Sequence, residues 1–420
     1  MRDWFRPRPY SHFDSRISRR TATTLVTDPA RVEGHAFLPF LSYEKRKRRY
    51  KADEHKTVWK PRPIAYAAHA DSQIYSYYSS VLSQAYESLV RGTRLDACVL
   101  AYRSLGKSNV DHAAEVFEQI PGRTPCTAMA FDVESFFDSL RHDLLRSAWR
   151  QTLGKQQLPE DHYRVFRSIT RYATVDRTKA YEALGIGKHP RGIKRRRLCS
   201  IQEFRELVRE AGLIHVREEK HGIPQGSPMS AVLSNIYMHS FDLAMAEAVG
   251  RCDGIYRRYS DDILVVCPSA SATPLRELVE HQLETLGLRL NSAKTEVTEF
   301  PGSCCAQPVG GLQYLGLTFD GTKTLLRSQS IGRFYQRLRR AVRKAERESI
   351  KRGSAVLLFK GQLYRRFSHH PGSRSFVRRY ALPASTMPGM ASIRKQVARH
   401  LRVLADEIAS AEARIAERAS

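Results

Sequence analysis

The sequence contains no uninterrupted apolar stretch of about 18 residues or more, the length that a helix needs to cross a bilayer. It also contains no recognisable signal peptide and no lipidation motif. These absences argue against a membrane partner and predict a cytoplasmic protein.

Cysteine pairs at the spacing of zinc and redox motifs are also missing. The seven cysteines include no Cys-x-x-Cys pair, their number is odd, and several lie in apolar surroundings, which is typical of buried free thiols in a reducing compartment. A zinc site formed by Cys304-Cys305 with His369-His370 is the alternative, but adjacent cysteines match zinc-ligand spacing poorly.

Acidic residues are scarce relative to basic ones. The chain has 43 Asp and Glu against 69 Lys and Arg, which gives a net charge of +26. A surface with this excess attracts polyanions, and nucleic acid is favoured because nothing points to a membrane. The 420 residues, 42% of them hydrophobic, are enough for two or three subdomains with large cores, and we find no internal repeat or low-complexity tract.

Two adjacent carboxylates, Asp261 and Asp262, lie between Tyr259 and the apolar residues 263–266. The β-branched run predicts a buried strand and residues 255–259 its partner, so we expect a tight hairpin with the carboxylates at its tip. Such a turn can aim both groups into one cleft, where a cation relieves their repulsion, and Mg²⁺ is the natural partner of hard oxygen ligands. A solvated Asp-Asp turn is the alternative interpretation.

A further carboxylate ends an apolar segment far upstream. Residues 128–131 are apolar, Asp132 follows them, and residues 136–140 read as the start of a helix. We therefore predict a core strand that ends at Asp132, and only the fold could bring it beside Asp261. Two strand-end carboxylates side by side would hold a metal pair, which clamps the attacking and leaving oxygens of a phosphoryl transfer.

These segments resemble the motifs of reverse transcriptases. The residues that carry the resemblance are the Tyr259-Ser260-Asp261-Asp262 box, Phe131-Asp132 through Leu140-Arg141-His142, the loop 222–230 (GIPQGSPMS), the segment 287–295 (GLRLNSAKT) and the Tyr314-Leu315-Gly316-Leu317 hairpin. Each motif alone is weak, but five of them in family order between residues 131 and 319 form a specific signal.

The resemblance implies an RNA-directed DNA polymerase that adds dNTPs by a two-metal mechanism. Asp132 and Asp261 would bind both Mg²⁺ ions, with Asp262 assisting and the carbonyl of Val133 as a further ligand, and Mn²⁺ would be a possible substitute. The primer 3′-hydroxyl would attack the α-phosphate of the incoming dNTP in line.

Several basic side chains would contact the phosphates of the nucleotide in this interpretation. By resemblance, Lys60, Arg62 and Arg103 would face the incoming triphosphate, with Arg103 at the end of a short strand expected at 99–103. Phosphate-backbone binding or a plain surface position are the alternatives for all three. Lys294, on a strand expected at 288–297, could protonate the leaving pyrophosphate or hold its charge, or make an ordinary phosphate contact.

Other residues would shape the nucleotide site. Phe137 would collide with a ribose 2′-hydroxyl and so select deoxynucleotides. Gln225 could reach a nucleotide or a template base, because Pro224 fixes the turn and Gly226 allows close approach, although a structural Gly-Pro turn is the alternative. Leu315 and Gly316 would form the primer grip.

The fold implied is α+β, a right-hand polymerase with fingers, a palm built on a small antiparallel sheet, a helical thumb and a helical C-terminal extension. The expected boundaries are a basic, irregular N-terminal arm at 1–50, fingers at 51–127, a palm at 128–320 with an inserted fingers segment at about 143–220, and thumb and extension at 321–420. A basic thumb helix is expected at 330–352, and a long terminal helix at 392–419. The rings of residues 360–380 could stack on single-stranded nucleic acid or could belong to the core.

Three other functions remain open at this point. An RNA-dependent RNA polymerase shares the palm, but Phe137 and the Pro-Gln-Gly box favour a reverse transcriptase. A catalytically silent RNA-binding scaffold is disfavoured because all three acidic positions are intact. Within the family, the basic residues from 362 onward resemble stand-alone, defence-associated bacterial enzymes, and a retron- or intron-like enzyme without a defence role is the alternative.

The partners expected from this interpretation are a structured non-coding RNA template, dNTPs and a DNA product, with a role in anti-phage defence. The sequence leaves the template, the priming mode and the oligomeric state unknown, and it assigns residues 174–220 no role beyond proximity to nucleic acid.

Overall fold

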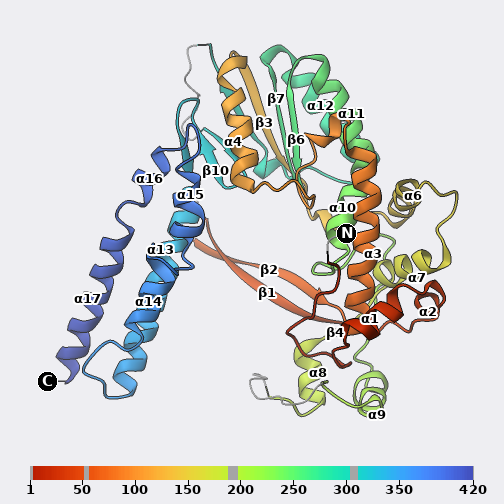
Figure 1. The fold of residues 1–420 in the computed structure, drawn as a ribbon, viewed down its shortest axis with the longest axis horizontal. Helices are drawn as coiled ribbons and strands as arrows, with labels where there is room; N and C mark the ends of the chain where they lie inside the picture. The colour runs from red at the N-terminus through yellow and green to blue at the C-terminus, as the bar shows by residue number, and fades with distance from the viewer. Residues whose placement is uncertain (1–2, 52–55, 188–196, 303–310, 420) are drawn as a thin grey trace. The chain divides into compact units, whose positions relative to one another are not determined.

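The computed structural model describes residues 3–51, 56–187, 197–302 and 311–419, with the backbone alone at 47–51, 56–57, 60 and 419 (Figure 1). The chain forms two compact units. Unit 1 comprises Met1–Arg103, Val133–Glu247 and Leu278–Asn291, and unit 2 comprises Ser104–Asp132, Ala248–Glu277 and Ser292–Ser420. None of the described helices has the length and apolar character required to span a bilayer.

Unit 1 is organised around a long two-stranded ribbon and a set of helices (Figure 1). Its sheet has the order β2-β1-β4-β5, with β1 (Phe40–Lys51) and β2 (Lys56–Tyr66) antiparallel, and with the short β4 (Ala173–Asp176) and β5 (His215–Val216) beside them. The helices of unit 1 are α1 (Arg19–Val26), α2 (Pro29–Glu33), α3 (His69–Val90), α5 (Phe136–Ser139), α6 (His142–Thr152), α7 (Glu160–Thr170), α8 (Arg177–Ala183), α9 (Ile201–Phe204) and α10 (Ser230–Tyr237). Two more helices, α11 (His239–Arg251) and α12 (Ala272–Thr285), have residues in both units.

The edge strand β2 contains two prolines, Pro61 and Pro63, which lie opposite Arg46 and Glu44 of β1. Proline has no N–H to donate, so within a sheet it is tolerated at an edge. Two prolines on one edge also remove donors that another strand could use, which protects the ribbon against edge-to-edge pairing.

Unit 2 contains a four-stranded antiparallel sheet of order β6-β7-β3-β8. Its strands are β3 (Cys126–Asp132), β6 (Ile255–Tyr259), β7 (Asp262–Pro268) and β8 (Glu296–Phe300). A smaller sheet contains β9 (Leu312–Tyr314), β10 (Leu317–Phe319) and β11 (Thr324–Leu326). The helices that follow are α13 (Ser328–Lys351), α14 (Lys360–Phe367), α15 (Leu382–Ala384), α16 (Ser392–Val397) and α17 (His400–Ala419).

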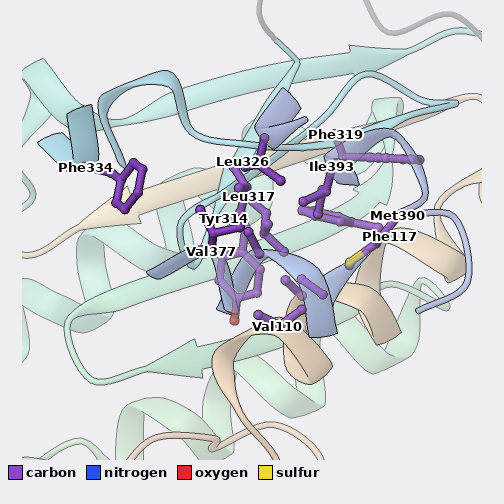
Figure 2. Packing of buried hydrophobic residues seen from close by; sticks show 14 of the residues in the cluster. Val110, Phe117, Tyr314, Leu317, Phe319, Leu326, Phe334, Val377, Met390 and Ile393 are labelled. Atoms are coloured by element: carbon purple, nitrogen blue, oxygen red, sulfur yellow. The ribbon is translucent and has the colours of Figure 1, made fainter. Parts of the chain in front are cut away.

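Helix α4 (Asn109–Gln119) packs on one face of the larger sheet. A capping box begins it, in which Ser108 and Asp111 bond each other's backbone N–H groups. Figure 2 shows Val110 and Phe117 of this helix among residues of the smaller sheet and the C-terminal helices, including Phe319, Val377 and Ile393. One apolar core therefore joins both sheets of unit 2 to its C-terminal segment.

The basic helix α13 confirms the expectation for residues 330–352. Its apolar side buries Phe334, Leu338 and Val342, and its other positions carry mostly basic side chains. Ion pairs tie it to α17, since Arg339 Nε lies 2.7 Å from Glu407 Oε1 and Arg414 Nε lies 2.8 Å from Glu346 Oε1. The α+β class, with a small antiparallel sheet and a helical C-terminal region, is confirmed.

The aromatic residues of 360–380 belong to the core rather than to a stacking surface. Phe367 is buried, and Tyr364, Phe376 and Tyr380 pack against the same apolar cluster. The exposed side chains of this segment include four arginines, which are Arg365, Arg366, Arg374 and Arg379.

Some predicted elements are wrong in detail. The N-terminal residues are not all irregular, because Ser18 and Asp28 cap two helices and Pro29 begins the second. The single terminal helix is two helices, since His400 Nδ1 donates to the Val397 carbonyl at 2.6 Å and satisfies the end of α16.

Two further corrections concern segments that carry candidate site residues. Residues 99–103 form a turn, with Tyr102 at φ 65°, because Arg103 bonds the carbonyls of Asp96 and Val99 that a strand would offer to a neighbour. Residues 288–297 do not form one strand: Ser292–Lys294 make a 3₁₀ turn and β8 begins at Glu296.

Candidate active site

Two carboxylates face each other across adjacent strands of unit 2. In the antiparallel pair β3–β7, Asp132 lies directly opposite Asp262. Opposite residues of an antiparallel pair project from the same face, so the last side chain of β3 and the first of β7 share one face of the sheet. The core strand that ends at Asp132 and the hairpin that precedes Asp262 are both confirmed.

The turn of the hairpin consists of Ser260 and Asp261, because Tyr259 pairs with Asp262. Ser260 has φ 63°, a conformation that two-residue hairpin turns require and that non-glycine residues adopt infrequently. Asp261 is thus at the tip, as predicted, whereas Asp262 is already the first residue of β7.

The buried side chain of Arg258 stabilises this turn by a hydrogen bond. Its side chain is fully buried, and its Nη1 donates a hydrogen bond of 3.0 Å to the carbonyl oxygen of Ser260. The sequence interpretation gave Arg258 no role, although its place in the Arg-Arg-Tyr-Ser-Asp-Asp segment, one alternation away from the half-exposed Arg257, was the available signal.

The carboxylates of Asp132, Asp261 and Asp262 lie close enough to repel one another. Loss of hydration, then repulsion from Asp261 and Asp132, raises the pKa of Asp262 to about 6, against the opposing influence of Lys294 and Arg327. Asp262 still contacts solvent at the end of its strand. Its raised pKa therefore reflects close packing of charges and protein atoms at a surface, and an added cation would favour its ionised form.

Lys294 contributes a positive charge to the same cluster. Its Nζ forms an ion pair with Asp132 Oδ2, with both side chains partly exposed. Arg327 is a second nearby cation, which lowers the pKa of both Asp262 and Glu296. Arg327 immediately precedes α13, and the sequence interpretation did not include it.

The donor set fits a hard divalent cation. Asp132 and Asp262 present carboxylate oxygens from one face, with Asp261 beside them, and their repulsion is the electrostatic condition that a cation relieves. Across the described ranges, no three His, Cys, Asp or Glu side chains are grouped closely enough to form a complete metal cage. Mg²⁺ commonly takes only one or two protein carboxylates and completes its shell with substrate phosphates and water, so the partial protein shell agrees with that ion.

The predicted primer grip forms the turn between β9 and β10. Tyr314 pairs with Leu317, which leaves Leu315 at φ 48° and Gly316 at φ 91° as the two turn residues. The positive φ of the second position suits glycine. The carbonyl of Gly316 accepts a bond of 3.1 Å from the N–H of Arg327, which joins this turn to the start of α13.

The other candidates of the palm motifs lie in unit 1. Val133 is buried and forms an isolated bridge with Leu290, and the half-buried Phe137 stacks obliquely on Phe136 with ring centroids 5.3 Å apart. Gln225 is half-buried, and its Nε2 donates a hydrogen bond of 3.0 Å to Asp138 Oδ2.

Arg103 occupies a structural position. Its Nε and Nη2 bond Glu87 at 2.9 Å, Nη2 also bonds Asp96 at 2.6 Å, and Nη1 bonds two carbonyls. Its side chain is only 2% exposed. Contact of Arg103 with a triphosphate stays a prediction, and it would require this network to open.

Arg62 is exposed on β2 and lies directly opposite Lys45 of β1. Like charges placed opposite each other on a ribbon repel, and a bound phosphate would remove that cost. The side chain of Lys60 lies outside the described residues, as do Cys304 and Cys305. Among the described cysteines, which are Cys98, Cys126, Cys199, Cys252 and Cys267, no disulfide is formed.

A pocket of about 460 Å³ lies in unit 1 beside the second half of the first palm motif. Its lining is polar and of mixed charge, and consists of Glu134, Ser135, Ser139, Arg141, His221, Gly287 and Arg289. The hydrogen bond of 2.8 Å from the N–H of Glu134 to the carbonyl of Arg289 joins two of its walls.

The sequence matches the family described as reverse transcriptase (RNA-dependent DNA polymerase) over residues 55–319. This match covers more than half of the chain and contains all five motifs. The chain therefore belongs to the reverse transcriptase (RNA-dependent DNA polymerase) family.

Solved structures with similarity to this chain include telomerases of two yeasts. Apo telomerase from Candida tropicalis aligns at 11% identity over 97% of this chain and 70% of that chain, with a TM-score of 0.45. The same telomerase truncated from its C-terminal domain aligns at 11% identity over 66% of this chain and 53% of that chain, with a TM-score of 0.41. Telomerase from Candida albicans, in complex with a fragment of telomeric RNA, aligns at 13% identity over 93% of this chain and 62% of that chain, with a TM-score of 0.41.

Proposed function

We propose that this reverse transcriptase adds dNTPs by a two-metal mechanism centred on Asp132, Asp261 and Asp262. The observation that carries the proposal is the register of β3 and β7, which places Asp132 opposite Asp262 on one face of the sheet. Two Mg²⁺ ions held by these carboxylates and by the Val133 carbonyl would activate the primer 3′-hydroxyl and stabilise charge on the transferring phosphate. Mn²⁺, which also prefers oxygen ligands, is the expected substitute.

The remaining roles belong to this chain's own side chains. Lys294, which forms an ion pair with Asp132, would donate a proton to the leaving pyrophosphate or stabilise its charge. Phe137 excludes a ribose 2′-hydroxyl, Gln225 contacts the nucleotide or the template base, and the exposed Arg62 supplies charge for the triphosphate, together with Lys60 and Arg103. Leu315 and Gly316 position the primer end.

The proposed domains are those expected from the sequence: a basic N-terminal arm at 1–50, fingers at 51–127, a palm at 128–320 with an inserted fingers segment at about 143–220, and thumb with extension at 321–420. The basic side of α13, which includes Arg337, Arg340 and Lys344, would follow the phosphates of a template–primer duplex.

The test is the pair of substitutions Asp261→Asn and Asp262→Asn in one protein. Extension of an oligo(dT) primer on poly(rA) should disappear, while RNA binding and the unfolding midpoint stay close to wild type, because the two carboxylates are at a solvent-accessible edge. Asp253→Asn with Glu299→Gln is the matched control, since both residues are exposed in unit 2 and the charge change is the same. Measurable extension by the Asp261/Asp262 variant would overturn the catalytic assignment.

We also propose that the natural template is a structured non-coding RNA and that the enzyme acts in anti-phage defence in the bacterial cytoplasm. The net charge of +26 and the exposed arginines of residues 360–400 support RNA binding by shape and phosphate contacts. The resemblance of this basic extension to defence-associated enzymes supports the biological role.

This second proposal is tested by expressing the gene with its flanking DNA and challenging the cells with a panel of phages, beside the Asp261/Asp262 variant. Protection that depends on those carboxylates, together with one dominant RNA on the purified protein, is expected. Many unrelated bound RNAs and no catalysis-dependent protection would favour a retron- or intron-like enzyme without a defence role. Protection that survives the double substitution would favour an RNA-binding scaffold.

A further inference from the structure

The side-chain amide of Gln225 is held by a carboxylate from a different segment of unit 1. Gln225 Nε2 lies 3.0 Å from Oδ2 of Asp138, which is on the short helix α5. Both residues are half-buried. Within loop 222–230, Gln225 is the only residue with a side-chain amide, so this bond fixes the one group in the loop whose separate donor and acceptor atoms could bond the edge of a base.

The backbone on the Asp138 side of this bond is anchored to the loop. The N–H of Gly222 donates to the Leu140 carbonyl at 2.8 Å, and the N–H of Ile223 donates to the Phe137 carbonyl at 2.9 Å. His221 Nδ1 bonds the carbonyl of Asp138 itself at 2.9 Å. Three hydrogen bonds therefore set the spacing between α5 and the loop without any help from the Asp138 carboxylate.

The backbone of Gln225 is anchored independently on its other side. Its carbonyl accepts a bond of 3.0 Å from the N–H of Ala65 in β2. Gly226 follows at φ 118°, where an added Cβ would lie 2.8 Å from the Ala65 carbonyl oxygen, so only glycine permits this approach. The contact with β2 thus fixes the position of the Gln225 backbone. The contact with Asp138 can therefore affect only the orientation of the side-chain amide.

The chemistry of the pair selects one orientation. An ionised carboxylate only accepts hydrogen bonds, so it must face the NH₂ half of the amide. Burial raises the pKa of Asp138, and Arg217, the hydrogen bond from Gln225 and His221 oppose that rise by favouring the ionised form. The carbonyl Oε1 and the second N–H of Gln225 are then left for a ligand, with Oε1 directed away from Asp138. Without a carboxylate the amide can rotate by half a turn, which exchanges donor and acceptor.

We propose that Asp138 is a positioning residue that fixes the amide orientation of Gln225, so that the carbonyl oxygen of Gln225 is presented to the incoming deoxynucleotide or its template base. This inference rests on the proposed contact between Gln225 and the nucleotide. A purely structural Asp138 that only secures the loop is the alternative. The two backbone hydrogen bonds and the His221 hydrogen bond described above already secure the loop and argue against that role.

The experiment compares Asp138→Ala, Asp138→Asn, Gln225→Ala and the double variant Asp138→Ala/Gln225→Ala. Primer extension on oligo(dT)-primed poly(rA) gives kcat and KM for dTTP, and incorporation of dGTP opposite the same template gives the error rate. Asp143→Asn is the matched control, because Asp143 is an exposed aspartate of unit 1, five residues further on, that pairs with Arg141.

We expect Asp138→Ala to raise the KM for dTTP about tenfold, which corresponds to about 1.4 kcal/mol, and to raise the error rate, with kcat changed much less. Asp138→Asn, which can still accept through Oδ1 but can also donate, should show a smaller rise. In the Gln225→Ala background, Asp138→Ala should produce no further change in KM, because the amide it orients is already gone.

Equal effects of Asp138→Ala in the presence and absence of Gln225 would overturn the inference, because they would show that Asp138 acts on the loop and not through the amide. So would an unchanged KM in both Asp138 variants. If Gln225→Ala itself leaves kcat, KM and error rate at wild-type values, the proposed nucleotide contact of Gln225 fails, whereas the catalytic assignment of Asp132, Asp261 and Asp262 is judged separately by its own variant. Should Asp138→Ala not fold, Asp138→Asn carries the same comparison.

Discussion

Asp132 and Asp262 lie directly opposite each other in adjacent antiparallel strands, so one face of a small sheet presents both carboxylates at its end. Lys294 and Arg327 supply positive charge around this pair, and the buried Arg258 holds the turn that carries Asp261. The site thus combines a rigid strand register with a balance of charges that a divalent cation and a triphosphate would complete.

Phe137 is predicted to exclude ribonucleotides. Phe137→Ala should increase the use of rNTPs relative to dNTPs, on the order of tenfold, because the smaller side chain leaves space for a 2′-hydroxyl. The measurement is the ratio of two kcat/KM values on poly(rA), one for the thymine nucleotide with ribose and one for the same nucleotide with deoxyribose. Phe137→Tyr retains the bulk of the ring and should keep the wild-type ratio. An unchanged ratio in the alanine variant would mean that Phe137 only packs against Phe136.

Lys294 is predicted to act on the leaving group and on the charge of Asp132. Lys294→Gln should lower kcat on the order of a hundredfold, with a small effect on the KM for dNTPs, when Mg²⁺ is saturating. Pre-steady-state extension of a single nucleotide measures the chemical step directly. Lys294→Arg keeps the charge with a poorer proton donor, so recovery by arginine would identify charge, and not proton transfer, as the contribution. A wild-type rate in Lys294→Gln would remove Lys294 from the mechanism.

The exposed basic side of α13 is predicted to carry much of the electrostatic binding to nucleic acid. Replacing Arg337, Arg340 and Lys344 with Gln should reduce the slope of log affinity against log salt by roughly two to three units, since each phosphate contact contributes roughly 0.7 to 0.9. Titration of a labelled RNA–DNA duplex at several salt concentrations gives this slope.

The control for that experiment uses arginines that the fold already neutralises. Arg339, Arg352 and Arg414 form ion pairs with Glu407, Glu348 and Glu346. Their replacement by Gln removes the same number of charges from the same region, and it should change the salt slope much less. Equal slopes for the two triple variants would show that net charge, and not the exposed side of α13, governs binding.

His12 is predicted to make the stability of unit 1 depend on pH. Burial, then repulsion from His69, lowers the pKa of His12 from 6.5 to about 3. Between these values the unfolded chain binds a proton that the folded chain does not, so stability is present at higher pH and is lost as the pH falls. From pH 7 to pH 5 this one group should account for about 2 kcal/mol of unfolding free energy.

The measurement is urea unfolding followed by tryptophan fluorescence, because Trp4, Trp59 and Trp149 are all in unit 1. His12→Gln should show a smaller loss of stability between pH 7 and pH 5 than the wild type. Parallel pH profiles for the two proteins would mean that other groups are responsible.

Local patterns were enough to predict the elements that carry the acids. The apolar run after Asp262 and the apolar run before Asp132 both form buried strands, and the amphipathic basic stretch forms α13. Each of these elements buries a continuous apolar face, so hydrophobic periodicity and strand propensity describe it well. The motif order placed the chain in its family for the same reason, since the spacing of motifs is a property of the sequence.

Local patterns failed where a long-range contact decides the conformation. Arg103 reads as the end of an exposed basic strand, but Glu87 and Asp96 draw its guanidinium inward and the strand becomes a turn. The sequence allowed the rings of residues 360–380 either to stack on nucleic acid or to enter the core, and Phe367 and its neighbours pack in the core of unit 2. In both cases the surroundings of the side chain are formed by residues that a local sequence pattern does not connect with it.

The sequence by itself determined that this protein has strands ending in carboxylates, a basic helix and the motifs of a reverse transcriptase, because these depend on residue type and short-range period. Only the tertiary structure decided that Asp132 lies opposite Asp262, that Lys294 pairs with Asp132 and that Asp138 holds Gln225. Strand register and contacts between distant segments follow from how whole apolar faces pack together, and a shift of the β3–β7 register by one residue would put Asp132 and its new strand partner out of step with the present pairing, so that Asp132 and Asp262 would no longer share one face.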